Sequence, residues 1–122
     1  EIPFDQIKEA MRKEMRDLLS QQLKADAVFL LNNNLALSCL ETIQAMDLRI
    51  PQDIAVASFD DMEAFQLCYP PVTAVAQPLS AIGEKAVTLL VDQINNQESY
   101  PMESSTLETN LVIRKSCGSY LK

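Results

Sequence analysis

Two adjacent carboxylates, Asp60 and Asp61, directly follow an apolar run over residues 54–59. Such a run is typical of a buried strand, so Asp60 is expected at the strand's carboxyl end. Ligands of open α/β sheets bind just beyond these ends, and a carboxylate accepts hydrogen bonds from hydroxyl or amine groups. The residues also fit a solvated strand-end turn. A catalytic pair is not expected, because neighbouring strand side chains point to opposite faces.

Three consecutive asparagines, Asn32 to Asn34, follow a second apolar run over residues 27–31. An asparagine side chain accepts hydrogen bonds from the free N–H groups of a helix's first turn. We therefore expect the triplet to cap a helix over residues 34 to 46, with ligand contact as a second possible role.

The chain lacks the residues on which most enzyme and metal sites depend. It has no histidine, and its three cysteines, Cys39, Cys68 and Cys117, lack Cys-x-x-Cys spacing. Without histidine there is no Ser/His or Cys/His pair for nucleophilic catalysis, and two glycines cannot make a glycine-rich phosphate loop. We expect no enzyme activity, no metal and no cofactor. The odd thiol count indicates reduced cysteines in a cytoplasmic protein.

The net charge of the chain and the lengths of its apolar runs exclude some classes of binding partner. The net charge is −7 over 122 residues, whereas a duplex DNA surface must gather positive charge. No apolar run approaches the roughly 20 residues of a membrane helix, so no membrane partner is expected. The length fits one domain or a piece of a larger one.

Hydrophobic periodicity predicts an α/β fold. Strands are expected at 27–31, 54–59, 72–76 and 107–113, with the first covered on both faces, and a short helical turn at 61–66. Helices are expected at 5–23, 34–46 and from 78 or 79 to about 96. Strands separated by helices imply right-handed βαβ units and a mostly parallel sheet.

Six segments resemble the LacI/GalR family of transcriptional regulators, in the same order along roughly residues 26 to 117. They are 29–37, 50–56, Phe59-Asp60-Asp61, Pro70-Pro71-Val72-Thr73, Ala76-Gln77-Pro78 and 111–117. The resemblance implies a three-layer α/β fold, a mostly parallel sheet flanked by helices, that forms one half of a two-lobed periplasmic-binding-protein-like core. In this interpretation residues 1–77 form the C-terminal lobe, residues 78–106 a crossover helix and loop that would pack on a missing N-terminal lobe, and residues 107–122 the final strand and tail.

The same resemblance implies a site and a mechanism. A small effector, sugar-like or nucleobase-like, would lie between the lobes and change operator affinity allosterically through a homodimer. Operator DNA would be bound by a headpiece that is absent from this chain. The effector contacts implied are Asn32, Asp60, Gln77, Leu79 and Phe4. The dimer contacts implied are Leu40, Phe65, Leu67, Cys68 and Tyr69.

The sequence departs from the family's pattern at a few positions. Asn33 stands where the family usually has Asp, and Ser38, Asp47 and Ser58 stand where it usually has Gly. These departures bear on the identity of the effector more than on the fold. Two other classes of function stay open: a periplasmic-type sugar-binding transport protein and a small flavodoxin-like enzyme.

Overall fold

The computed structural model describes residues 6–19, 25–95 and 104–120. These residues form two compact units. Unit 1 comprises Glu1–Ala76 and Leu111–Lys122, and unit 2 comprises Gln77–Asn110.

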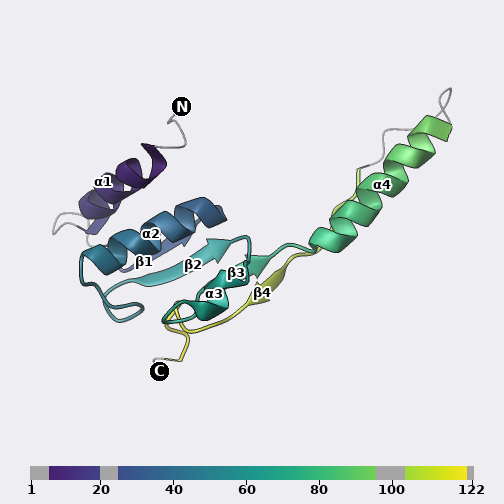
Figure 1. Ribbon diagram of the computed structural model, residues 1–122. Coiled ribbons are helices and arrows are strands. Elements are labelled where there is room, and N and C mark those ends of the chain that lie inside the picture. The colour runs from purple at the N-terminus through teal and green to yellow at the C-terminus, as the bar shows by residue number, and fades with distance from the viewer. Residues whose placement is uncertain (1–5, 20–24, 96–103, 121–122) are drawn as a thin grey trace. The chain divides into compact units, whose positions relative to one another are not determined.

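Helices and strands alternate along the chain, as the periodicity predicts (Figure 1). The helices are α1 (Ile7–Leu19), α2 (Asn33–Ala45), α3 (Ala64–Leu67) and α4 (Leu79–Asn95). The strands are β1 (Ala27–Leu30), β2 (Ala55–Phe59), β3 (Thr73–Ala76) and β4 (Asn110–Val112). None of the helices in the described part of the chain is long and apolar enough to cross a membrane.

The strands form one open sheet in the order β1-β2-β3-β4. β1 pairs with β2 and β2 with β3, both in parallel, with Leu30 opposite Ser58 and Phe59 opposite Val75. This register brings the carboxyl ends of β1, β2 and β3 to the same edge of the sheet. The α/β class and the mostly parallel sheet are thus confirmed.

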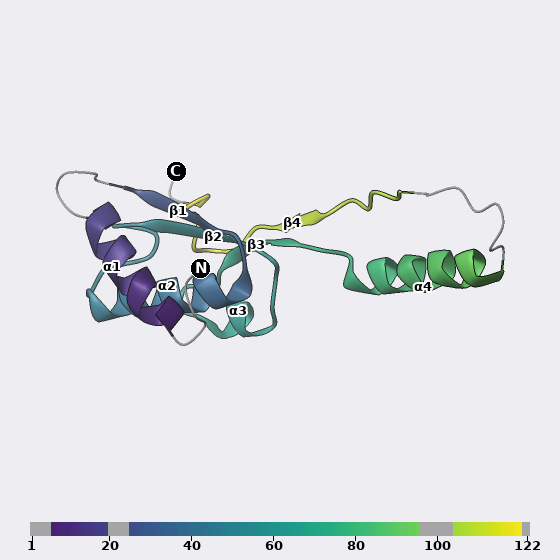
Figure 2. The same cartoon turned by 90° about the horizontal axis from the view of Figure 1, so that it is seen from above.

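The core of unit 1 lies between the sheet and its helices. α1, α2 and α3 lie on one face of the sheet (Figure 2), where α2 packs against β1 and β2 and α1 packs against α2. The thiol of Cys39 on α2 donates to the sulfur of Met15 on α1 at 3.5 Å. The fully or nearly buried core residues are Met15, Leu30, Ala36, Cys39, Ile43, Ile54, Val56, Phe65, Val72 and Ala74.

The ends of α2 confirm two expectations about local sequence. The Oδ1 atom of Asn32 accepts from the backbone N–H of Leu35 at 3.0 Å, which is the N-cap bond that the asparagine triplet predicts. Just past the C-terminus, Asp47 has a φ of 54°. This left-handed conformation favours glycine, and aspartate is one of the few other residues that tolerate it.

Three elements differ from their predictions. β1 is an edge strand on which Ala27 and Phe29 are exposed and only Leu30 is buried, so the expectation of a strand covered on both faces is wrong. An apolar run cannot by itself tell an edge strand from a central one. The final strand is limited to Asn110–Val112, and the turn predicted at 61–66 is a short helix over Ala64–Leu67.

Unit 2 is built around α4, a helix of 17 residues. No side chain of α4 is buried. Its larger apolar residues are exposed instead: Leu79, Ile82, Val87, Leu90, Val91 and Ile94.

Candidate functional site

Asn32 and Asp60 lie at the same edge of unit 1. Asn32 comes two residues after the end of β1, and Asp60 directly follows β2. Because β1 and β2 are paired parallel neighbours, the two polar residues follow adjacent strand ends. This edge is where open α/β sheets bind ligands.

The backbone at Asp60 is unusual. Its φ of 68° lies in the left-handed region, which costs a non-glycine residue about 1–2 kcal/mol relative to ordinary conformations. Such conformations persist when surrounding contacts hold them, and they are frequent at ligand sites. The strand therefore turns sharply at the residue expected to bind a ligand.

Asp61 is not the solvated carboxylate that a simple strand-end turn would present. Its two carboxylate oxygens accept from the Nη1 and Nη2 atoms of Arg114, each at 2.7 Å. The side chains are only 20% and 13% exposed, respectively. The bidentate hydrogen bond from Arg114 lowers the pKa of Asp61, and it raises the pKa of Arg114 in turn.

Arg114 is itself held in place by the start of β3. Its Nη1 atom donates to the carbonyl of Val72 at 2.6 Å. Its backbone N–H donates to the hydroxyl of Thr73 at 2.9 Å. Arg114 thus joins the turn after β2 and the start of β3 to the segment after β4.

Sequence reasoning missed this ion pair, because the two partners are 53 residues apart. One signal was present: Arg114 directly follows the apolar residues Leu111, Val112 and Ile113. A cation in that position suggests a specific partner near the end of a strand, but it does not say which carboxylate that partner is.

Ser58 also contributes to this edge. Its hydroxyl is buried and lies 2.9 Å from the carbonyl oxygen of Phe59 and 3.4 Å from that of Leu30. The residue that replaces the family's usual glycine therefore places a donor between the ends of β1 and β2.

The other predicted effector contacts are placed as follows. Gln77 directly follows β3 and is the first residue of unit 2, and Leu79 is the exposed first residue of α4. Phe4 lies outside the described residues. The contact of each of these three residues with the effector stays a prediction.

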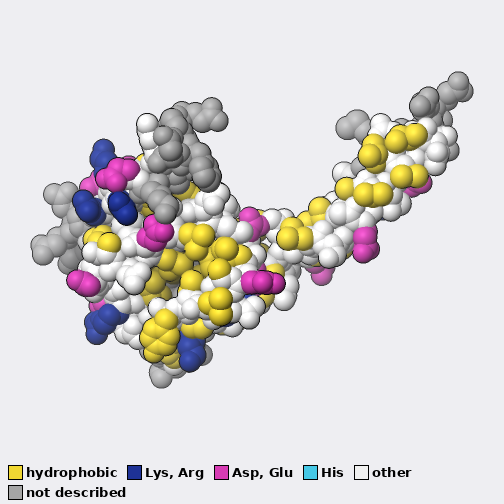
Figure 3. Space-filling view, viewed as in Figure 1, with side chains coloured by type: hydrophobic (Ala, Val, Ile, Leu, Met, Phe, Trp, Pro, Cys, Tyr) yellow, Lys and Arg dark blue, Asp and Glu magenta, His cyan; other side chains and the backbone are white. Residues whose placement is uncertain are grey.

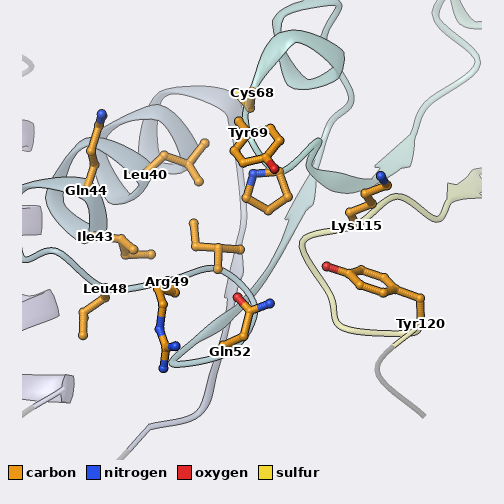
Figure 4. Close-up of a pocket in the computed structure, with 12 residues that line it drawn as sticks. Leu40, Ile43, Gln44, Leu48, Arg49, Gln52, Cys68, Tyr69, Lys115 and Tyr120 are labelled. Atoms are coloured by element: carbon orange, nitrogen blue, oxygen red, sulfur yellow. The ribbon is translucent and has the colours of Figure 1, made fainter.

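A hollow of about 620 Å³ lies elsewhere in unit 1. It is lined partly by residues that precede β2 and β3, such as Ile50, Gln52 and Pro70. It is therefore at the opposite edge of the sheet from Asn32 and Asp60. Leu40, Tyr69, Lys115 and Tyr120 surround it (Figure 4).

The predicted dimer residues divide into two groups. Leu40, Cys68 and Tyr69 line the hollow, and Leu67 stands beside them in sequence, 87% exposed. Phe65 is completely buried in the core of unit 1, so it supports this surface from beneath rather than forming it.

Comparison with known proteins assigns the fold. Residues 3–117 match the family model described as "Periplasmic binding protein-like domain". The "Lactose operon repressor" of Rhizobium radiobacter is 35% identical over 104 residues, which cover 85% of this chain and 90% of that protein. The chain belongs to the LacI/GalR family. This confirms the resemblance found in the sequence.

Further relatives are regulators, not enzymes, as expected. The "HTH-type transcriptional regulator CelR" of Thermobifida fusca is 36% identical over 84% of this chain and 30% of its own length. The "HTH-type transcriptional repressor CytR" of Escherichia coli K12 is 35% identical over 88% of the chain and 31% of its length. The chain thus spans about a third of the length of these two relatives.

Solved structures of this LacI/GalR fold include ligand complexes. The "transcriptional regulator CelR-cellobiose complex" has a TM-score of 0.77 and 34% identity, covering 89% of this chain and 33% of that one. A LacI family regulator from Enterococcus faecium "with bound ribose" has a TM-score of 0.77 and 27% identity, covering 89% and 39%. Neither the transport protein nor the enzyme alternative gains support from these relatives.

Proposed function

We propose that this chain is the ligand-sensing part of a DNA-binding transcriptional regulator, and that it binds a small polar molecule, a sugar or a purine-like compound. The observation that carries the proposal is the placement of Asn32 and Asp60 at adjacent carboxyl ends of parallel strands. Two relatives with known structures are named with cellobiose and ribose, molecules whose hydroxyls suit a carboxylate acceptor.

In this proposal, Gln77 and Leu79 also contact the ligand, and Phe4 stacks on it. Residues 1–77 and 107–122 act as the C-terminal lobe, and residues 78–106 pack on an N-terminal lobe outside this chain. The exposed apolar side chains of α4 support that packing, since each large apolar side chain left in water forfeits roughly 1.5–3 kcal/mol.

The proposed mechanism is allosteric. A ligand bridging the two lobes favours one angle between them, and a homodimer transmits that angle to DNA-binding headpieces outside this chain. A ligand shifts such an equilibrium only by its differential affinity for the two states, typically by about 1–3 kcal/mol. A protein that binds operator DNA works in the cytoplasm, where we expect this one.

Substitution of Asp60 tests the site. In the full-length regulator, Asp60→Ala should abolish the ligand response while operator binding stays intact. Asp60→Asn, which tolerates the left-handed backbone, should weaken ligand binding about 10- to 100-fold, because a charge-assisted hydrogen bond contributes about 1.5–3 kcal/mol. Titration calorimetry with cellobiose and ribose, and operator binding measured by fluorescence anisotropy, provide the readouts.

Asp26→Ala is the matched control, because Asp26 is an exposed aspartate just before β1, at the opposite edge of the same sheet. It should leave both readouts unchanged. A ligand response that survives Asp60→Ala would show that the site is assigned to the wrong residue.

The dimer proposal rests on the surface around the hollow. Figure 3 shows hydrophobic side chains gathered on the face of unit 1 that carries α2 and α3. Leu67 and Tyr69 project from this face, 87% and 101% exposed, and Tyr69 also lines the hollow. A two-fold dimer contact is self-complementary, so the projecting side chains of one copy can fill the hollow of the other.

We expect Leu67→Asp with Tyr69→Asp to convert the dimer to a monomer, because the charges would be buried without partners. Sedimentation velocity over a range of concentrations measures this. The control is Leu31→Asp, at an equally apolar position after β1 that is 69% exposed. A dimer that persists at micromolar concentration in the double variant would rule out this surface as the contact.

A further inference from the structure

The turn that contains Asp60 is held by contacts of the neighbouring residue Asp61, which has no role in the proposed ligand site. Asp60 has left-handed backbone geometry, and the next residue, Asp61, is clamped by Arg114. The Oδ1 atom of Asp61 also accepts from the backbone N–H of Met62 at 3.0 Å. The peptide units on the C-terminal side of Asp60 are thus anchored through one carboxylate.

The ion pair holds Asp61 in place because Arg114 is itself bound to the start of β3. The guanidinium is bound to the Val72 carbonyl, and the Arg114 backbone is bound to the Thr73 hydroxyl. The following residues are held too, since the N–H groups of Lys115 and Ser116 donate to the carbonyl of Pro71. Asp61 is therefore tied to a fixed point in the sheet.

We propose that Arg114 is a positioning residue for the ligand site: by clamping Asp61 it holds Asp60 in the left-handed turn from which its carboxylate meets the ligand. The last step rests on the proposed function, whereas the effect on the turn does not. Binding groups perform best when neighbouring contacts lock them in place before the ligand arrives.

A second ion pair in the chain provides a control for the effect of losing an ion pair away from the ligand site. Asp53 and Arg49 form a second bidentate pair, with Nη2 to Oδ1 at 2.7 Å and Nε to Oδ2 at 2.8 Å. Asp53 precedes β2, whereas Asp61 follows it. Asp61→Asn and Asp53→Asn are therefore the same chemical change in two bidentate pairs at opposite ends of one strand, the Asp53 pair being local and the more exposed of the two.

The test measures the Asp60 backbone directly by NMR in the full chain. A residue with positive φ gives a strong NOE between its own amide proton and Hα. We expect this NOE to weaken markedly in Asp61→Asn and in Arg114→Lys, because lysine keeps the charge but cannot bind both oxygens in a fork. The NOE should be unchanged in Asp53→Asn. Arg114→Lys serves as the second variant if Asp61→Asn fails to fold.

The outcomes separate the two proposals. A full-strength Asp60 NOE in both Asp61→Asn and Arg114→Lys, or an equal loss in Asp53→Asn, would overturn the positioning role. With cellobiose and ribose as probes, Asp61→Asn should weaken binding about tenfold and Asp53→Asn should not. If the NOE is lost but neither Asp61→Asn nor Asp60→Asn alters sugar binding, the proposed ligand site fails while the clamp on the turn stands.

Discussion

Replacing Phe65 by alanine should lower the free energy of unfolding of unit 1 by about 3–5 kcal/mol, the usual cost of truncating a buried phenylalanine. Phe65 is the largest fully buried side chain among the described residues. It lies on α3, whose four residues bury no other side chain, so the contact of α3 with the core depends on this ring. The backbone N–H of Val72 also donates to the carbonyl of Phe65 at 3.0 Å.

Urea unfolding followed by far-UV circular dichroism measures this change. The matched control is Leu67→Ala, because Leu67 lies on the same short helix and its side chain is exposed. Both variants are measured at a protein concentration low enough to keep the protein monomeric. It should change the free energy of unfolding by no more than about 0.5 kcal/mol. Equal effects of the two substitutions would mean that α3 does not pack as the structure shows.

Ser116→Ala should destabilise unit 1 by about 2–4 kcal/mol, although it removes a single oxygen atom. The hydroxyl of Ser116 is completely buried. It donates to the carbonyl of Val56 at 2.6 Å and accepts from the backbone N–H of Thr73 at 2.8 Å. Leaving a buried donor or acceptor unsatisfied costs about 1–3 kcal/mol each, and this substitution removes a partner from one of each.

The comparison for Ser116→Ala is Ser105→Ala, at an exposed position where a change of less than about 0.5 kcal/mol is expected. Urea unfolding of both variants in parallel measures the difference. If Ser116→Ala were as mild as Ser105→Ala, the bonds from Ser116 to β2 and β3 would contribute little to holding the C-terminal segment on the sheet.

Local sequence determined most of the fold. Hydrophobic periodicity predicted α1, and the asparagine triplet predicted the start of α2 together with its cap bond to Asn32. Short apolar runs predicted the strands to within a few residues, and their alternation with helices implied the parallel pairing. These features depend on contacts within a few residues, which a sequence pattern records.

The candidate site was predictable only in part. The carboxyl ends of parallel strands share an edge, so the parallel sheet that the sequence implies places Asn32 and Asp60 at the same edge. The left-handed turn at Asp60 and the partner of Asp61 do not follow from it. Nor does the burial of Phe65, which the resemblance placed among the dimer contacts although its ring lies in the core.

The sequence by itself determined the α/β class, the family and the kind of residue that ends each strand, because periodicity, caps and motifs are local properties. Only the tertiary structure decided that Arg114 binds Asp61 rather than Asp60, and that Ser116 joins β2 to β3. These contacts join residues 43 to 60 positions apart. They form where the folded sheet brings the C-terminal segment back beside β3, and no local pattern encodes which of two neighbouring carboxylates it will meet.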